Sequence, residues 1–97
     1  MIDMYVGKNK DIAFRIIEGE AIILTPEDGR LHNLNPVATR IFELANGRRK
    51  IRDIINLICE EFEVSRDIAQ RDTLNFIEDL VHRQLLIFHN RPTKSSS

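Results

Sequence analysis

Few side chains in this sequence are of the types that carry out chemistry, and those present are widely spaced. The three histidines, His32, His82 and His89, stand apart, and the single cysteine, Cys59, has no histidine beside it. Zinc sites need several such ligands at close spacing, and a cysteine nucleophile needs an adjacent base. We therefore expect the histidines at the surface or the core edge, and we expect Cys59 to fill the core rather than react.

Two carboxylates have a spacing that deserves a test for acid–base chemistry. Asp72 and Asp79 are seven residues apart on one predicted helix and share a face of it. Nothing nearby supplies a nucleophile or a cleft that excludes water, and the four glycines form no phosphate-binding loop. The sequence therefore predicts a protein that is not an enzyme and that uses no metal and no cofactor.

Length and charge exclude several classes of protein. The chain has 97 residues, with 14 lysines and arginines against 15 aspartates and glutamates. One small core is expected from this length, and the balanced charge predicts no general attraction to nucleic acid or to an anionic membrane. No apolar run resembles a signal peptide or a membrane span, so we expect a cytoplasmic protein.

Three strands are predicted in the first third of the chain. Runs of apolar and β-branched residues occupy 12–17 and 21–25, and a third strand should follow the second turn at 30–34. Glu18–Glu20 and Pro26–Gly29 have the composition of tight turns. Two short hairpins give the strand order 1-2-3, so the first and third strands are edges and the second is central.

The third predicted strand changes abruptly into a helix. Asn35 is a good N-cap and Pro36 suits the first helical position, so a helix should run from here to Ala45. Asn46 and Gly47 can adopt the left-handed conformation that closes a helix. This junction is expected to be rigid.

Two further helices and an apolar segment complete the predicted fold. One amphipathic helix should run from Lys50 or Ile51 to Phe62, and a second, capped by Ser65, should run to about His82 or Gln84. Leu85–Phe88 is predicted to cross the core as a strand or extended segment. The whole is an α+β, winged helix-turn-helix-like domain: a three-stranded antiparallel sheet, three helices and a short C-terminal apolar segment.

Both ends of the chain are expected to lie outside this domain. Residues 1–11 are short, mixed and lysine-bearing, which suggests a flexible N-terminal arm, although Tyr5 and Val6 are able to dock. Residues 90–97, with Pro92 and three serines, are expected to be disordered. The domain itself should then span residues 12–89.

A winged-helix pattern raises the possibility of DNA binding, with the third helix as recognition helix. From Ser65 to Gln84 that helix carries three arginines and four carboxylates, a net charge of 3 − 4 = −1, which disfavours phosphate contacts. The one basic cluster, Arg48–Lys50 with Arg52, fits a solvated loop better than contact with an acidic partner. A DNA-binding or regulatory protein is therefore the second hypothesis.

Peptide binding is the leading hypothesis because the third strand is an edge. Its outer backbone groups are expected to be unpaired, and an extended peptide can add to such an edge as a new strand. The apolar arc of the third helix is wider than one packing contact needs, so it can form a groove below the added strand. Alternatively, the N-terminal arm or a second copy of the chain, as a homodimer, shields the edge.

These elements resemble the PqqD-like family. The residues that carry the resemblance are Ile22–Leu24, Leu34-Asn35, Asn46-Gly47, Phe62, Arg71-Asp72, Phe76-Ile77, Leu80 and Leu85-Leu86. Members are small peptide-recognition domains that hold the leader segment of a ribosomally made precursor peptide for a modifying enzyme, often a radical S-adenosylmethionine enzyme, in coenzyme PQQ synthesis and other pathways. The resemblance covers about residues 12–88.

The resemblance also implies a site. Carried over by position, it assigns backbone pairing to the third strand and the groove to the third helix. The strand residues are Arg30, Leu31, His32 and Asn33, and the helix residues are Arg71, Leu74, Asn75 and Glu78. Gln84 departs from the family, which often has glycine before the Leu-Leu pair, and would cost up to about 1 kcal/mol if its backbone is left-handed. Asn46 replaces an acidic residue and is compatible with a helix end.

Overall fold

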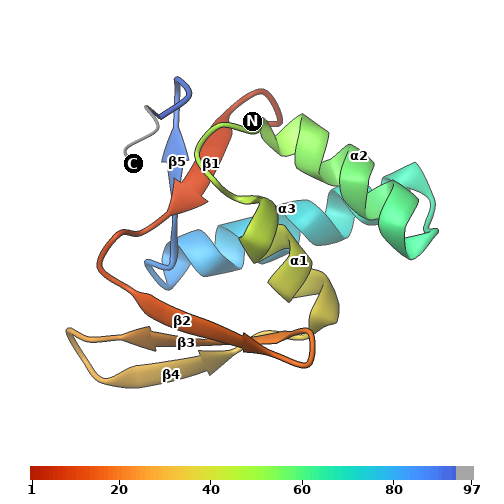
Figure 1. The fold of residues 1–97 in the computed structure, drawn as a ribbon. Helices are drawn as coiled ribbons and strands as arrows, with labels where there is room; N and C mark the ends of the chain where they lie inside the picture. The colour runs from red at the N-terminus through yellow and green to blue at the C-terminus, as the bar shows by residue number, and fades with distance from the viewer. Residues whose placement is uncertain (94–97) are drawn as a thin grey trace.

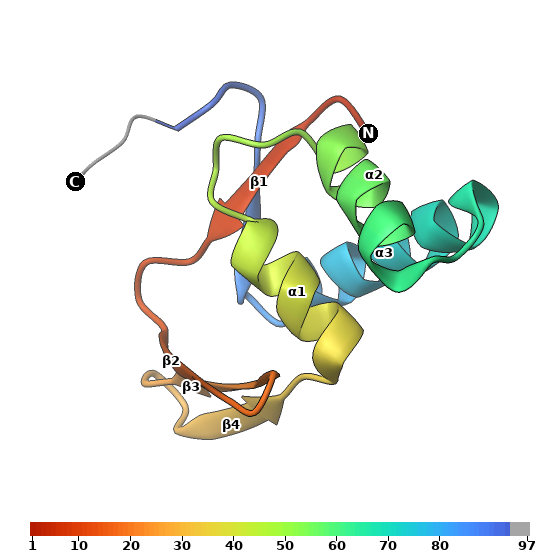
Figure 2. The ribbon, with the colours of Figure 1, turned by 45° about the vertical axis from the view of Figure 1, so that its right-hand side comes forward.

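The computed structural model describes residues 1–93, and three helices lie over one face of a small sheet (Figure 1). A two-stranded ribbon lies at the opposite side of the helices from that sheet (Figures 1 and 2). The elements in chain order are β1 (Tyr5–Lys8), β2 (Ala13–Ile17), β3 (Glu20–Thr25), β4 (Arg30–Asn33), α1 (Pro36–Leu44), α2 (Ile51–Phe62), α3 (Arg66–His82) and β5 (Leu86–His89). The predicted α+β fold, with its three-stranded antiparallel sheet and three helices, is confirmed.

The sheet has the predicted order, β2-β3-β4, with β3 in the centre. Glu18 and Gly19 join β2 to β3 and have positive φ angles of 52° and 79°, the combination that a two-residue type I′ hairpin requires. Gly29, with φ of 68°, precedes β4 at the end of the second turn. Both hairpins therefore form where turn-forming residues predict them.

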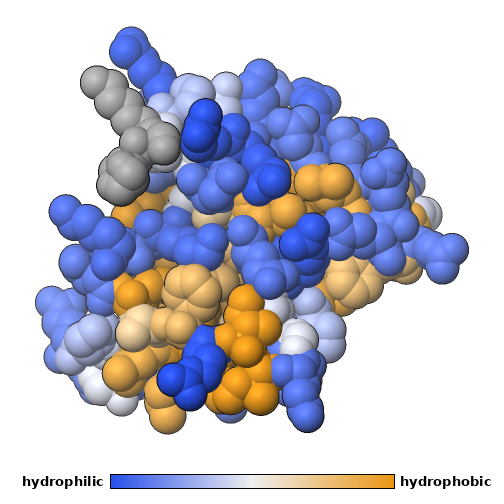
Figure 3. Space-filling model, in the orientation of Figure 1, coloured by the Kyte–Doolittle hydropathy of each residue, from blue (hydrophilic) through white to orange (hydrophobic). Residues whose placement is uncertain are grey.

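The two faces of the sheet have different surroundings. Ala21 and Ile23 point inward and are fully buried, whereas Ile22 and Leu24 alternate with them and remain 36% exposed. Apolar side chains gather on the surface over the sheet (Figure 3). The outer face thus carries an apolar patch that no element of the described chain covers.

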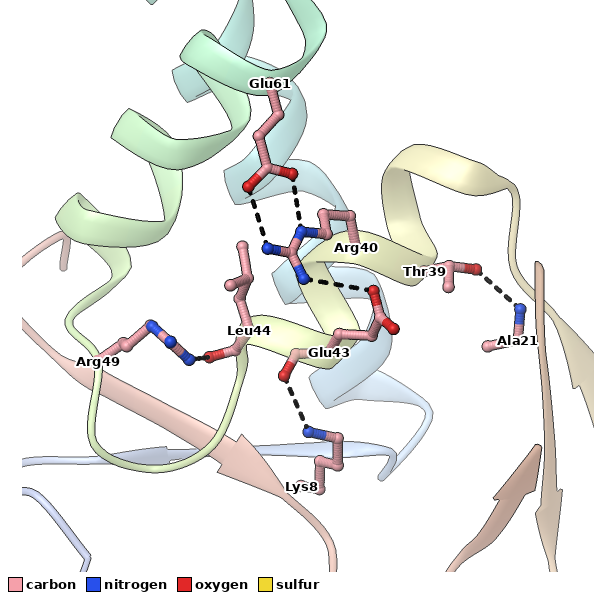
Figure 4. Close-up of polar contacts among 8 residues, drawn as sticks. All are labelled: Lys8, Ala21, Thr39, Arg40, Glu43, Leu44, Arg49 and Glu61. Atoms are coloured by element: carbon pink, nitrogen blue, oxygen red, sulfur yellow. Dashed lines mark hydrogen bonds and ion pairs between the residues drawn. The ribbon is translucent and has the colours of Figure 1, made fainter. Parts of the chain in front are cut away.

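The junction between β4 and α1 has the predicted caps and one further contact. The Asn35 side chain accepts a hydrogen bond from the N–H of Ala38 at 2.8 Å, and Pro36 is the first helical residue. The buried hydroxyl of Thr39 accepts from the N–H of Ala21 at 2.8 Å (Figure 4). It also donates to the carbonyl of Leu34 at 3.1 Å. It therefore bridges two backbone groups where β4 leaves the sheet.

Cations from outside α1 cover the C-terminal end of that helix. The ammonium of Lys8 donates to the carbonyl oxygen of Glu43 at 3.4 Å, and Arg49 donates to that of Leu44 at 3.2 Å (Figure 4). Lys8 also donates to the carbonyl of Ala45 at 3.1 Å. These carbonyls have no partners within the helix and carry partial negative charge. Burial lowers the pKa of Lys8.

The second and third helices have the predicted bounds and cap. The Ser65 hydroxyl accepts from the N–H of Ile68 at 3.3 Å. At the other end of α3, the N–H of Gln84 donates to Val81 and that of Leu85 donates to Leu80, at 2.9 and 2.8 Å. This pair of bonds, with Gln84 at a φ of 64°, is a Schellman motif. Its left-handed position is held here by glutamine.

The N-terminal segment is part of the fold rather than the flexible arm that its composition suggests. Residues 1–11 were expected to form an arm outside the domain, but β1 pairs with β5 in an antiparallel ribbon, and Val6 is fully buried. The carbonyls of Met4 and Ile2 accept hydrogen bonds from the first N–H groups of α2, at Ile51 and Arg52. The segment therefore supplies the cap of α2, because Lys50 makes no side-chain cap.

The structure also differs in part from the prediction at the C-terminal end of α1 and in the C-terminal tail. The helix ends at Leu44, and Gly47, with φ of 80°, donates its N–H to Val6 of β1 at 2.7 Å. Thr93 donates its N–H to the carbonyl of Gly47 at 2.8 Å, so the described part of the expected disordered tail contacts the fold. Residues 94–97 of that tail lie outside the described residues.

The core lies between the sheet, the three helices and the ribbon. Its largest fully buried side chains are Val6, Ile23, Ile41, Phe42, Ile51, Ile54, Ile55, Ile58, Ile77, Leu80, Leu85 and Leu86. Every element except β2 and β4, together with Leu85 just before β5, contributes to this set. Within the described chain, no helix is long and apolar enough to cross a membrane.

Candidate functional site

The outer edge of β4 is open. No strand of the described chain pairs with that side. Beyond the end of β4, the N–H of Leu34 donates to the carbonyl of Ala21 at 2.9 Å. Bonded pairs alternate along an antiparallel ladder, so the next bonded pair is His32 with Ile23. The backbone groups of His32 are therefore directed toward β3.

The alternate residues of β4 present their backbone to the open side. Leu31 and Asn33 lie between the bonded pairs, so their N–H and C=O groups point away from β3. An extended segment that aligns with this edge can form a bonded pair with each of them. The predicted edge thus exists, and its hydrogen-bonding groups belong to two identified residues.

A cleft lies alongside this edge, between β4 and the C-terminal end of α3. Its main part has a volume of about 500 Å³. A smaller hollow of about 120 Å³ continues toward the start of α1. The main part is lined by Asp28, Arg30, Leu31, His32, His82 and Arg83, and the hollow by Asn33, Leu34, Asn35, Ala38, Phe76, Asp79, Leu80 and Arg83. Because Arg83 lines both, we treat them as one groove.

The side chains of β4 divide between this groove and solvent. His32 shares the inner face of the sheet with its partner Ile23, and Arg30 alternates onto the same face. Leu31 points to the outer face and is 67% exposed. A strand added beside β4 would divide its own side chains in the same way, so that alternate residues enter the groove.

The four predicted residues of β4 come together at the edge, but those of α3 lie elsewhere on the helix. Arg71, Leu74, Asn75 and Glu78 are not among the residues that line the groove, and all but the half-buried Leu74 are exposed. Asn75 and Glu78 each lie one turn before a groove-lining residue, Asp79 and His82 respectively, so they border the groove on the helix surface. Their role in binding stays a prediction.

The flank of α3 that faces the groove was not singled out as a site from the sequence. Phe76, Asp79 and Arg83 follow one another at intervals of three and four residues and all line the groove. This stripe borders the buried stripe that ends at Leu80. The spacing is visible in the sequence, but it does not say which border of the buried stripe meets β4.

The groove carries mixed charge. The guanidinium of Arg83 pairs with Asp79 at 3.1 Å. The carboxylate of Asp28 accepts hydrogen bonds from the hydroxyl of Thr25 and from the N–H of Arg30, and these bonds lower its pKa. The guanidinium of Arg30 has no carboxylate within 4.0 Å in the described chain. Its donors are therefore available to a ligand.

Several of the cations that DNA binding would need are engaged within the protein. On α3, Arg71 pairs with Asp72 at 3.2 Å. In the basic cluster, Arg52 pairs with Asp3 at 2.9 Å, and Arg49 caps α1. These contacts favour a structural role for the cluster over a phosphate-binding one, which weakens the second hypothesis.

The residues considered for chemistry occupy structural positions. The half-buried thiol of Cys59 donates to the carbonyl of Val64 at 3.0 Å, which holds the turn after α2. Within residues 1–93, no three histidine, cysteine or acidic side chains cluster as a metal site would require. His32 and His82 both line the groove.

Comparison with known proteins places the chain in a family. The family model for coenzyme PQQ synthesis protein D (PqqD) matches residues 20–86, whereas no curated protein matches. Among solved structures, TbiB1 in complex with the TbiA(beta) leader peptide has a TM-score of 0.76 at 23% identity, over 94% of this chain and 98% of that one. Lasso peptide synthetase B1 complexed with the leader peptide has a TM-score of 0.75 at 20% identity, over 84% and 96%.

A third similar structure is the PqqD truncation of Methylobacterium extorquens PqqCD, described as a functional, stand-alone RiPP recognition element. Its TM-score is 0.69 at 21% identity, over 88% of this chain and 89% of that one. At these identities the structural likeness establishes the fold alone. The family model, which spans β3 to the start of β5, establishes more: this chain belongs to the PqqD family, the family of coenzyme PQQ synthesis protein D.

Proposed function

We propose that this protein is a non-catalytic recognition module that binds the leader segment of a ribosomally synthesised precursor peptide. The observation that carries the proposal is the open edge of β4. There the backbone groups of Leu31 and Asn33 point away from β3, and the groove lies alongside. Membership of the PqqD family supports it, as do two structural neighbours that were solved with leader peptides. The leader adds as a strand beside β4, and its alternate side chains enter the groove.

The module presents the bound leader to a modifying enzyme. A protein without a catalytic cluster of its own can raise the local concentration of a substrate by binding both substrate and enzyme. The resemblance noted from the sequence favours a radical S-adenosylmethionine enzyme as that partner. Because ribosomal precursors are made in the cytoplasm, we place the module there.

Calorimetric titration tests binding. Short peptides encoded beside the gene are titrated one at a time, and at least one should bind with a defined stoichiometry. Absence of binding with every neighbouring candidate would contradict the proposal. Light scattering on the same samples distinguishes a complex with peptide from a homodimer formed through the same edge.

Hydrogen exchange then tests where the peptide lies. The amides of Leu31 and Asn33 point outward, so peptide binding should slow their exchange, whereas the amide of His32 already donates to β3 and should change little. This alternating pattern is specific to strand addition. A peptide bound only through side chains would leave the amides of Leu31 and Asn33 as they are in the free protein.

A further inference from the structure

We infer that the leader recognised by this chain carries an apolar side chain at the residue that pairs with Leu31, and that this side chain lies on the outer face of the sheet. The inference rests on the proposed function, because it names a side chain by which the open edge of β4 selects its peptide. Its basis is a row of apolar side chains that crosses the outer face of the sheet and ends at that edge.

Three side chains form this apolar row, one from each strand. Ala13 of β2 lies directly opposite Leu24 of β3, and Leu24 lies directly opposite Leu31 of β4. Residues that face each other across neighbouring strands have their Cβ atoms about 5 Å apart on the same face of the sheet. Because the preceding residue of β3, Ile23, is buried and points inward, the row lies on the outer face.

Leu31 is the least covered member of the apolar row. It is 67% exposed, the largest fraction among the large apolar residues that the structure describes, apart from none, whereas Leu24 is 36% exposed. Leu24 has a strand on each side, but Leu31 has one only on the side of β3. Edge strands commonly carry charged side chains that discourage pairing. A leucine at the edge does the opposite, since a further strand would cover its free flank.

An added strand supplies the missing neighbour. The N–H and C=O of Leu31 point away from β3, so in an antiparallel complex they form a bonded pair with one peptide residue, whose Cα lies roughly 5.5 Å away. The side chain of that residue points to the same face as the side chain of Leu31. It therefore becomes the fourth member of the apolar row.

The contact favours an apolar residue, above all a β-branched or aromatic one. Packing against the free flank of Leu31 removes apolar surface of both side chains from water. Pairs of such side chains across strands stabilise a sheet more than a pair of alanines does. A charged residue at this position would find no opposite charge within the row. The edge thus selects its peptide through a side chain on the outer face as well as through the backbone.

A display selection tests the inference without a known ligand. Random ten-residue peptides are selected on the wild type, on Leu31→Glu, on Ala13→Glu and on Asn33→Pro. Ala13→Glu is the matched control, because Ala13 is exposed in the same row but lies two strands away from β4. Asn33→Pro removes an outward N–H and leaves Leu31 in place, so it identifies the peptides that depend on the edge.

Wild type and Ala13→Glu should both enrich peptides with an apolar residue at one fixed position. Leu31→Glu should instead enrich lysine or arginine at that position, because opposite charges pair favourably across strands. For a selected peptide, changing the apolar residue to lysine should weaken calorimetric affinity for the wild type about fivefold and strengthen affinity for Leu31→Glu. The first of these comparisons alters only the peptide, so it does not depend on the folding of a variant.

The outcomes separate the inference from the proposed function. If edge-dependent peptides have no apolar position that responds to Leu31→Glu, or if Ala13→Glu shifts the selection equally, the inference is overturned while the proposed function stands. The inference also fails if light scattering shows a dimer that Leu31→Glu dissociates, because a second copy then covers Leu31. If the wild type enriches nothing beyond Asn33→Pro, the proposed function itself fails. Circular dichroism of each variant verifies that the fold is retained.

Discussion

Gln84 lies at the end of α3, in a backbone position where glycine is the usual residue. It holds the left-handed position of the Schellman motif that ends α3, where glycine has no steric penalty. The side-chain amide of Asn9 donates to the carbonyl of Gln84 at 2.7 Å, and the N–H of Asn9 donates to Leu85. Contacts with the segment after β1 therefore help to hold a strained turn that aims the chain into β5.

Replacing Gln84 with glycine should stabilise the protein. A left-handed backbone costs a residue with a Cβ about 1–2 kcal/mol, and the greater freedom of glycine in the unfolded chain returns about 0.5–1 kcal/mol. We expect Gln84→Gly to raise the free energy of unfolding by about 0.5–1 kcal/mol in urea denaturation. Gln84→Ala, the control, should stay near the wild type. A glycine variant no more stable than the alanine variant would show that the turn is not strained.

At the scale of the element, β4 combines a short length with an open side. Strand edges tend to pair with other chains, and proteins limit this with short strands and charged side chains. β4 has four residues and begins with Arg30, so it follows that pattern on a side that is nevertheless uncovered. The strand is long enough to offer two outward-facing residues and too short to pair extensively.

Proline at the outward positions of β4 should weaken peptide binding and preserve the fold. Leu31→Pro and Asn33→Pro each remove an N–H that points away from β3, so no ladder bond is lost. We expect calorimetry to give at least about tenfold weaker binding from the lost bond and the ring at the edge. Leu31→Val keeps the N–H and should bind nearly as the wild type does. Unchanged affinity in both proline variants would place the peptide elsewhere.

The success of sequence-based prediction varies between elements for physical reasons. Caps and turns are local, so Asn35, Ser65 and the Glu18–Gly19 turn could be identified from neighbouring residues alone. β1 could not, because its four residues have no clear alternation and its partner β5 lies about eighty residues further along the chain. Strand pairing at that distance leaves no local pattern.

The candidate site likewise has one part that local residues predict and one part that depends on distant contacts. The open edge of the third strand of the sheet follows from two short hairpins, which local residues specify. Which flank of α3 faces that edge depends on how the helix rotates against the sheet and α1. That rotation is set by packing across the whole core, so the stripe containing Phe76 and Asp79 was not assigned to the groove from the sequence.

At the scale of the whole molecule, ion pairs join segments that are distant in sequence. Asp3 beside β1 pairs with Arg52 of α2, and Arg40 of α1 pairs through two hydrogen bonds with Glu61 of α2 (Figure 4). In each case the hydrogen bond to the arginine lowers the pKa of the carboxyl group. Both pairs hold α2 to its neighbours, although exposed pairs contribute little individually.

These pairs should make part of the stability dependent on acid. A carboxyl group whose pKa is lower in the folded than in the unfolded state stabilises fully above its unfolded value, near 4 to 4.5, and this contribution is lost as the pH falls through the folded value. The free energy of unfolding should therefore fall between about pH 5 and pH 2, less steeply in high salt. The double variant Asp3→Asn, Glu61→Gln should show a shallower fall in urea titrations. An equal fall in both proteins would contradict this role.

The ribbon of β1 and β5 determines when a newly made chain is able to complete its fold. The ribosome produces β1 first, yet its partner begins at residue 86, so Val6 and the apolar faces around it stay exposed to water until nearly the whole domain has emerged. The β2–β4 sheet, built from neighbouring hairpins, has no such wait. Pairing with β5 therefore completes the core around Val6 and holds in place the N-terminal segment that caps α2.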